Sequence, residues 1–356
     1  EDAEMYANLV DDLKAKGKLA ESGVVYDPYT MLEAEGEVLS LVVDGHAVET
    51  ANVGDMVEVT LPGTGFYIES GGQVGDMGVI AAGPLSGVEG WSIEVSSMRK
   101  PAPGLVVHVG EVASGNPKVG NLAVAKVDQM RRKDIMRNHT ATHLLHAGLH
   151  EILGDHARQA GSLVAPDRLR FDFTHPEALT RDEIEAIERY VNERVLEDHA
   201  MHTEVKSLQE AMDGGATALF GEKYGEVVRN LTMGGDPSTG SGQVFSNELC
   251  GGTHVESSGQ VGTFIITSEG SAAAGIRRIE AITGRAAYDL IQRRFSVMNR
   301  AAALISSTPE KIEEHMEHAL SEMKEMRNTI QTLRKNIAAA DFTRVLDETS
   351  SVGGIT

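Results

Sequence analysis

The side chains best suited to bind a metal ion lie in two short segments far apart in the sequence. His139 and His143 are four residues apart, a spacing that places both imidazoles on one face of a helix. Cys250 and His254 are separated by Gly-Gly-Thr, and the glycines permit a tight turn that lets both side chains converge. Three imidazoles and one thiolate form a tetrahedral set that suits zinc best. The spacing therefore favours one Zn²⁺ per chain, bound by these four residues.

Several other metal and nucleophile chemistries lack their motifs. The chain has no His-Glu-x-x-His for a zincin protease, no Pro-Cys-x-x-Cys for a zinc deaminase and no Gly-x-Ser-x-Gly elbow. Residues 235–241 copy part of a phosphate-binding loop but lack its lysine, so segment 234–242 is expected to be a mobile Gly/Ser-rich loop. His146 and His150 share the helix of the first pair, where we expect supporting or surface roles.

Composition narrows the class of protein. The 356 residues include 32 Lys and Arg against 53 Asp and Glu, a net charge of −21, which excludes a generally basic surface for nucleic acid. Cys250 is the single cysteine, so no intrachain disulfide framework exists and a reducing compartment is expected. No apolar run approaches the roughly 18 residues of a membrane-spanning helix, and no signal peptide is visible. These features predict a cytoplasmic protein with no membrane partner.

The elements that must position these residues fall into zones. Residues 1–23 hold a charged helix candidate, and 24–127 alternate with period two between glycine turns, which predicts a small barrel or sandwich. Asp44-Gly45 is a strong hairpin-turn dipeptide. Further on, 131–153 reads as a helix, 169–173 as a strand and 180–199 as a helix with a Thr180 and Glu183 capping box. This mixture predicts an α+β domain.

The last zone carries a heptad pattern. Apolar residues follow a 4-3 alternation from Ile312 to Ile337, and a shorter run from Ile291 to Ile305 does the same. Thr308 is a candidate N-cap before Pro309. The pattern predicts an antiparallel helical hairpin, which serves either as a spacer or as a dimerisation or substrate-cradling arm.

At these motifs the sequence resembles the editing half of alanyl-tRNA synthetase. The two histidine and cysteine segments match the paired zinc motifs of that family, and three further stretches agree in the family's order. The matching segments are 139–146, 249–255, 65–76, 159–164 with 169–173, and 274–284.

The resemblance implies a fold class and a domain plan. It implies an α+β chain in which a small β-barrel precedes an editing core with a zinc site and a helical hairpin. The implied boundaries are 1–23 for an N-terminal helix, 24–128 for the barrel, 129–285 for the core, 286–345 for the hairpin and 346–356 for a linker. The family's ATP-using aminoacylation domain and its C-terminal domain are expected to be missing partners of the same chain, so no ligase activity is expected here.

The implied reaction is hydrolysis of the ester that joins serine or glycine to alanine tRNA. A synthetic pocket cannot strongly reject an isostere that adds a hydroxyl, whereas a second site that hydrogen-bonds the hydroxyl can select it. Thr142 and Gln159 match the editing-pocket positions, and Ser162 is expected to act with them in catalysis. Thr142 would bond the serine hydroxyl, unless it is simply part of the helix surface. The acceptor end of the tRNA is the expected partner.

Local tRNA contacts are expected despite the negative net charge. Gly71 and Gly72 would let the tRNA backbone approach closely, although an ordinary strand turn would need the same residues. Arg170 and Arg277 belong to local basic clusters, and phosphate contacts need only a stripe of such charge. A homodimer is also compatible with the sequence.

The sequence is compatible with three other functions. The chain could be a freestanding trans-editing deacylase, a non-catalytic zinc-stabilised RNA-binding or dimerisation module, or a general metallohydrolase. Four protein ligands close a tetrahedral zinc, which favours an anchoring or structural ion, but a loose His254 would open a position for catalysis. No general base emerges from the residues. A water held by Gln159, or the terminal ribose hydroxyl, would have to serve.

Overall fold

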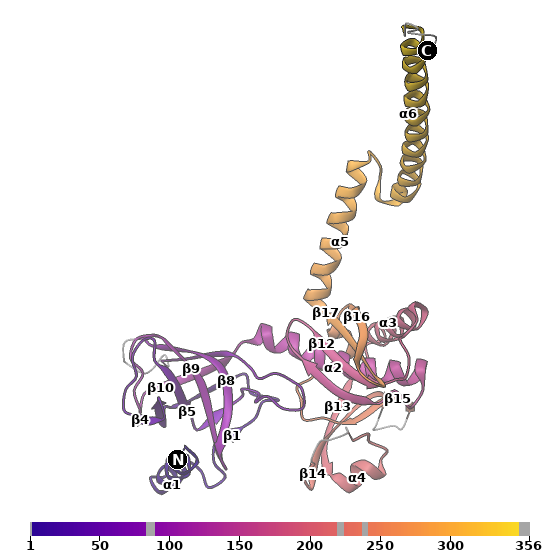
Figure 1. The fold of residues 1–356 in the computed structure, drawn as a ribbon. Coiled ribbons are helices and arrows are strands. Elements are labelled where there is room, and N and C mark those ends of the chain that lie inside the picture. Colours follow the sequence, from indigo (N-terminus) through magenta and orange to yellow (C-terminus); the bar gives the residue numbers. More distant parts are fainter. Residues whose placement is uncertain (1, 83–89, 219–223, 237–240, 349–356) are drawn as a thin grey trace. The chain divides into compact units, whose positions relative to one another are not determined.

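The computed structural model describes residues 2–82, 90–218, 224–236 and 241–348 (Figure 1). It divides into two compact units, Glu1–Tyr288 and Asp289–Thr356. None of the described helices combines the length and the apolar composition needed to span a bilayer.

The N-terminal part of the first unit is a helix packed on an eight-stranded antiparallel sheet with the order β2-β10-β7-β8-β9-β5-β3-β4. The two end strands, β2 and β4, do not pair with each other in the described residues, so closure into a barrel stays a prediction. At the β3–β4 hairpin, Asp44 and Gly45 have φ of 49° and 76°, as the turn dipeptide predicts. The elements of this part are α1 (Asp2–Ala15), β1 (Val25–Tyr26), β2 (Glu33–Glu37), β3 (Ser40–Val43), β4 (His46–Val48), β5 (Met56–Thr60), β6 (Gly63–Thr64), β7 (Gly78–Ala82), β8 (Ser92–Ala102), β9 (Leu105–Ser114) and β10 (Leu122–Val127).

The second part of this unit places one long helix against a second sheet. Helix α2 (Gln129–Leu153) begins at Asp128, whose side chain accepts hydrogen bonds from two backbone amides of the first turn. It packs on α3 (Arg181–Leu196) and on the four-stranded sheet β11-β12-β17-β16. Thr180 and Glu183 form the predicted capping box of α3. The strands are β11 (Gln159–Val164), β12 (Leu169–Thr174), β16 (Phe264–Ala273) and β17 (Ile276–Thr283).

A three-stranded sheet leads directly to Cys250. It consists of β13 (Met201–Ser207), β14 (Val227–Asp236) and β15 (Ser241–Leu249), with α4 (Leu208–Asp213) packed on the first two strands and η1 (Ser258–Val261) following. The prediction of a loop over 234–242 is therefore wrong at both ends, because the two strands extend into that segment. Residues 237–240 lie outside the described residues.

The second unit is helical, and its apolar seam is exposed. Helix α5 (Gly284–Leu304) enters this unit, and η2 (Pro309–Lys311) leads into α6 (Ile312–Glu348). Thr308 occupies the N-cap of η2 without making a side-chain capping bond. The helices are as predicted, but their packing as a hairpin is not observed. On the heptad seam, Met326, Leu333 and Ile337 are 55%, 54% and 62% exposed.

Candidate metal centre and hydrolytic site

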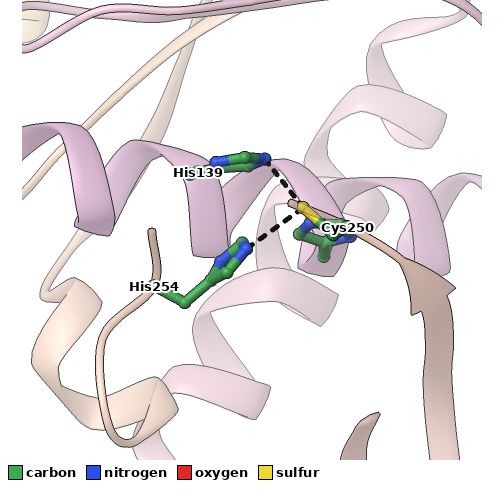
Figure 2. A group of neighbouring side chains, drawn as sticks. His139, Cys250 and His254 are labelled. Atoms are coloured by element: carbon green, nitrogen blue, oxygen red, sulfur yellow. Dashed lines mark hydrogen bonds between the residues drawn. The ribbon is translucent and has the colours of Figure 1, made fainter. Parts of the chain in front are cut away.

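Four side chains from three segments of the chain converge beside α2. His139 and His143 come from successive turns of α2, Cys250 follows β15 and His254 lies in the loop after it. Their ligand atoms all lie within 4.8 Å of one another, and all four residues are buried. Figure 2 shows His139 and His254 directed at the sulfur of Cys250, whose Sγ lies 3.4 Å and 3.2 Å from their Nε2 atoms. This cluster could bind a metal ion.

The Nδ1 atom of each imidazole lies within hydrogen-bond distance of a side-chain oxygen. His139 Nδ1 lies 2.6 Å from Gln73 Oε1, and His143 Nδ1 lies 2.8 Å from Glu248 Oε2. His254 Nδ1 lies 3.2 Å from Thr140 Oγ1. These partners orient all three rings with Nε2 toward the centre, the arrangement in which a carboxylate or amide supports a metal-bound histidine.

The donor set fits zinc. His143 Nε2 is buried and lacks a hydrogen-bond partner in the described part of the chain, an unsatisfied atom that a metal ion at the centre would bind. Zinc prefers four ligands of this kind, imidazole nitrogens and cysteine thiolates. The residues present therefore suit the ion that the sequence predicts.

The charges in the cluster favour the ligand form of the cysteine. Burial raises the pKa of the Cys250 thiol, but the imidazoles of His139, His254 and His143 outweigh it and hold that pKa well below its usual range. Burial lowers the pKa of His143, but the Glu248 carboxylate and Cys250 raise it to about 10. Burial and the neighbouring His139 lower the pKa of His254 to about 3. These neighbours favour the thiolate form of Cys250, the species that binds metal ions.

In the Gly-Gly turn between Cys250 and His254, close approach to α2 requires a glycine at the second position. Neither Gly251 nor Gly252 has a positive φ. A Cβ on Gly252 would instead come within 1.9 Å of the His139 ring, so only glycine lets the turn approach α2 so closely. Gln73 fixes the turn, because its Oε1 accepts from the Thr253 amide at 2.9 Å and its Nε2 donates to the Thr253 hydroxyl at 2.9 Å.

A cavity of about 240 Å³ opens beside the metal centre. Its lining includes the predicted pocket residues Thr142, Gln159 and Ser162 together with His139, His143 and Cys250. The Thr142 hydroxyl donates to the Asn138 carbonyl at 2.8 Å, so its lone pairs remain to accept. Gln159 Nε2 donates to Ser162 Oγ at 3.4 Å. The structure thus brings the three predicted pocket residues and three of the four predicted ligands to one cavity, whereas His254 lies outside its lining; their roles stay predictions.

The two predicted glycines form a turn against β11. Gly71 and Gly72 have φ of 57° and 81°, which favours glycine at both positions. A Cβ on Gly72 would meet Ser162 Oγ at 2.5 Å, and the Gly72 carbonyl accepts from the Val164 amide at 2.7 Å. Gly71 lines the cavity. Close packing of the N-terminal sheet region on the core explains Gly72 without tRNA.

The two predicted arginines lie beside carboxylates. Arg277 lies 2.6 Å from Glu269, and Arg170 lies 3.8 Å from Asp172, which also binds Arg278 at 2.7 Å. Neither Arg170 nor Arg277 is part of the cavity lining. Their contact with tRNA phosphate stays a prediction, and each arginine would then have to bind a phosphate and its neighbouring carboxylate at the same time.

Sequence reasoning missed the residues that support the ligands. Glu248 bridges two histidines of α2, because its second oxygen lies 3.0 Å from His146 Nδ1. Arg132 and Asp76 form a buried ion pair that joins the N-terminal sheet region to α2. The nearest sequence signal for Glu248 is its position two residues before Cys250, and Gln73 lies inside one of the motifs that carry the resemblance.

Comparison with known proteins agrees with the geometry. Residues 3–131 match the family model described as tRNA synthetases class II (A), and residues 228–280 match the threonyl and alanyl tRNA synthetase second additional domain. The alanine–tRNA ligase of Chloroflexus aurantiacus is 42% identical over 330 residues, which cover 92% of this chain and 36% of the relative. The alanine–tRNA ligase of Ruegeria sp. is 40% identical over 357 residues, which cover 100% of this chain and 39% of the relative. The chain thus spans less than two fifths of the length of these two relatives. On this evidence the chain belongs to the alanyl-tRNA synthetase family.

Proposed function

We propose that this chain hydrolyses the ester that joins serine or glycine to the 3′ end of alanine tRNA, at a pocket beside a zinc ion. The observation that carries the proposal is the single cavity that contains the hydroxyl of Thr142, the Gln159–Ser162 pair and three of the four candidate metal ligands. The family relationship supplies the tRNA substrate. In this proposal His139, His143, Cys250 and His254 hold the zinc ion.

Thr142 supplies the selection for serine. Its own proton is engaged by the Asn138 carbonyl, so it faces the cavity as an acceptor that a serine hydroxyl can satisfy. With glycine, a water molecule has room to donate to the same oxygen. With alanine, the methyl group occupies that space and leaves the buried Thr142 oxygen unpaired, which costs about 1–3 kcal/mol.

Gln159 and Ser162 position the attacking water. Because Ser162 Oγ accepts from Gln159, its own proton is free to bond a water oxygen, and its remaining lone pair can accept. The water oxygen attacks the ester carbonyl carbon, the bond to the ribose oxygen breaks, and the water proton passes to that ribose oxygen. The products are free serine and a tRNA with an intact terminal hydroxyl. Zinc held by the four ligands would supply a fixed positive charge beside the pocket.

The test is deacylation of alanine tRNA charged with serine or with alanine, after one zinc per chain has been verified. We expect the unmodified chain to release serine much faster than alanine. Thr142→Val should reduce this preference by roughly 10- to 100-fold. Thr329→Val is the matched control, because Thr329 makes the same bond to the carbonyl four residues earlier, at 3.0 Å, but lies exposed on α6.

A folded, zinc-loaded chain that hydrolyses neither substrate would contradict the proposal. That result would favour the alternative of a non-catalytic zinc-stabilised module, which a closed set of four protein ligands also fits.

A further inference from the structure

A guanidinium on the cavity wall and an aromatic ring stacked on it lie outside the roles described above. The Tyr29 hydroxyl donates to the Gly251 carbonyl at 2.8 Å, and the Arg229 guanidinium lies 4.2 Å from the centre of the Tyr29 ring. Arg229 also donates to the carbonyl oxygens of Cys250 at 3.2 Å and Gly252 at 2.7 Å. Arg229 and Gly251 both line the cavity, and Tyr29, which lines a neighbouring hollow with Arg132 and Lys133, contacts both of them.

The Tyr29 segment is held in place before any ligand binds. The Asp27 carboxylate accepts from the Tyr29 amide at 3.0 Å in a turn closed by its own side chain. The buried Arg132, already paired with Asp76, donates to the Pro28 carbonyl at 2.6 Å. The ring is therefore preorganised, so little conformational entropy is lost when a ligand packs on it.

The rim has the properties of a nucleotide contact. Tyr29 remains 47% exposed although it is stacked on one side by Arg229. Among the described residues, no Asp or Glu carboxylate forms an ion pair with Arg229, whose side-chain donors instead contact the Cys250 and Gly252 carbonyls and the Thr203 hydroxyl. A Cβ added at Gly251 would meet no atom within 4 Å, which leaves open space at the mouth. An aromatic face, a positive charge without a carboxylate partner and room beside it suit a base attached to a phosphate backbone.

We propose that Tyr29 is the stacking platform for the base of the 3′-terminal nucleotide, an adenine in tRNA, while its aminoacyl group occupies the cavity. This assignment rests on the proposed function, because it requires the ester to enter beside the metal centre. Arg229 backs the ring and draws the anionic backbone toward the rim. Tyr29 is thus a binding residue for the nucleotide and takes no part in bond breaking.

The experiment compares two non-hydrolysable probes on the zinc-loaded chain. One is serine joined by an amide to 3′-amino-3′-deoxyadenosine, and the other carries a methoxy group in place of adenine. We expect loss of the base to weaken binding about 10- to 100-fold in the unmodified chain and less than about threefold in Tyr29→Leu. Tyr29→Phe keeps the ring but loses the bond to Gly251, and should retain the full dependence on the base. Tyr288→Leu, at a tyrosine that is 61% exposed on α5, is the control.

Two results would overturn the platform. One is equal dependence on the base in Tyr29→Leu and the unmodified chain; the other is a Tyr29→Phe variant that loses as much as Tyr29→Leu. If Tyr29→Leu does not fold, Tyr29→Trp decides, because its larger ring should preserve the dependence and loss of it would refute the proposal. An unmodified chain that deacylates serine and binds the first probe upholds the proposed function whatever the variants show. An unmodified chain that does neither overturns both.

Discussion

Two buried histidines, one in the N-terminal sheet and one at the metal centre, differ in the charge that their neighbours allow. His108 is bonded only to neutral groups, the Thr64 hydroxyl at 2.8 Å and the Val59 carbonyl at 3.2 Å, and burial lowers its pKa to about 4. His143 is just as buried, yet the carboxylate of Glu248 and the thiolate of Cys250 raise its pKa to about 10. Burial favours the neutral form unless an opposite charge is buried with the group.

The comparison separates a region that is stable without charge from one that depends on mutual compensation. The sheet core around His108 is apolar, with Phe66 packed edge-on against the His108 ring, and it contains neutral polar pairs such as Ser40 and Thr60 at 2.8 Å. The metal centre gathers a thiolate, a carboxylate and several imidazoles in one buried volume. Removing one member there leaves the others without compensation, whereas removing a neutral partner of His108 such as Thr64 leaves no buried charge behind.

The largest expected effect is loss of the metal centre through Cys250→Ala. Hydrolysis should disappear, and the core around α2 should lose about 3–5 kcal/mol of stability, because buried imidazoles lose both the thiolate and the ion. Hydrogen exchange of backbone amides measures this region by region. Amides of α2 and β15 should exchange faster, and those of β5 and β9 should not. Chelation of zinc from the unmodified chain should give the same pattern, and its restoration should reverse it. Unchanged protection of α2 after metal removal would contradict the dependence.

Acid should act on His108 in a defined window. Its folded pKa of about 4 lies below the 6.5 of the unfolded chain, so below pH 6.5 the unfolded state binds a proton that the native state does not. The contribution is complete above pH 6.5 and is lost as the pH falls toward 4, by about 3 kcal/mol in all.

His108→Gln isolates this contribution from the metal ligands, which also release their ion in acid. Urea unfolding of the zinc-loaded proteins at a series of pH values should show a smaller loss of stability for the variant between pH 6.5 and 4. Parallel pH profiles for the variant and the unmodified chain would show that His108 is protonated in the folded state.

Glu248→Gln should have a smaller effect on the metal centre than Cys250→Ala, and it is measured as a change in metal affinity. The amide can still accept from His143, but it lacks the charge that strengthens the imidazole as a ligand and can no longer accept at both oxygens for His143 and His146. We expect zinc to bind about 10- to 100-fold more weakly in competition with a chromogenic chelator. Glu94→Gln, on an exposed position of β8, should leave the affinity unchanged. Equal affinities for Glu248→Gln and the unmodified chain would show that Glu248 does not support the ligand.

Features with a local cause could be predicted from the sequence. The Thr180 cap depends on residues three apart, and the shared face of His139 and His143 depends on helical spacing. Glu248 could not be found in this way, because its bonds to His143 and His146 connect residues 105 and 102 apart and depend on where β15 ends against α2. The same holds for Gln73, whose amide reaches 66 residues along the chain to His139.

In the helical unit, a local pattern predicted the helices but not their packing. A 4-3 pattern indicates an apolar face but does not name what covers it, so the predicted packing of the two helices went beyond the pattern. Similarly, the turn at Gly252 was correctly placed, but the reason for its glycine lies in the position of the His139 ring, which only the folded chain provides.

The smallest effect is expected on α6, where a buried and an exposed position of the helical unit can be compared. Met326 lies on the heptad seam and is 55% exposed, so Met326→Lys should change the free energy of unfolding by no more than about 0.5 kcal/mol. Ala302 in α5 is 2% exposed, and Ala302→Lys should destabilise the helical unit far more, because a charge would replace a buried methyl group. Thermal melting followed by circular dichroism, at two protein concentrations tenfold apart, measures both. A Tm that rises with concentration and falls on Met326→Lys would show that a second copy of the chain covers the seam in solution, since a seam without a partner gives neither dependence.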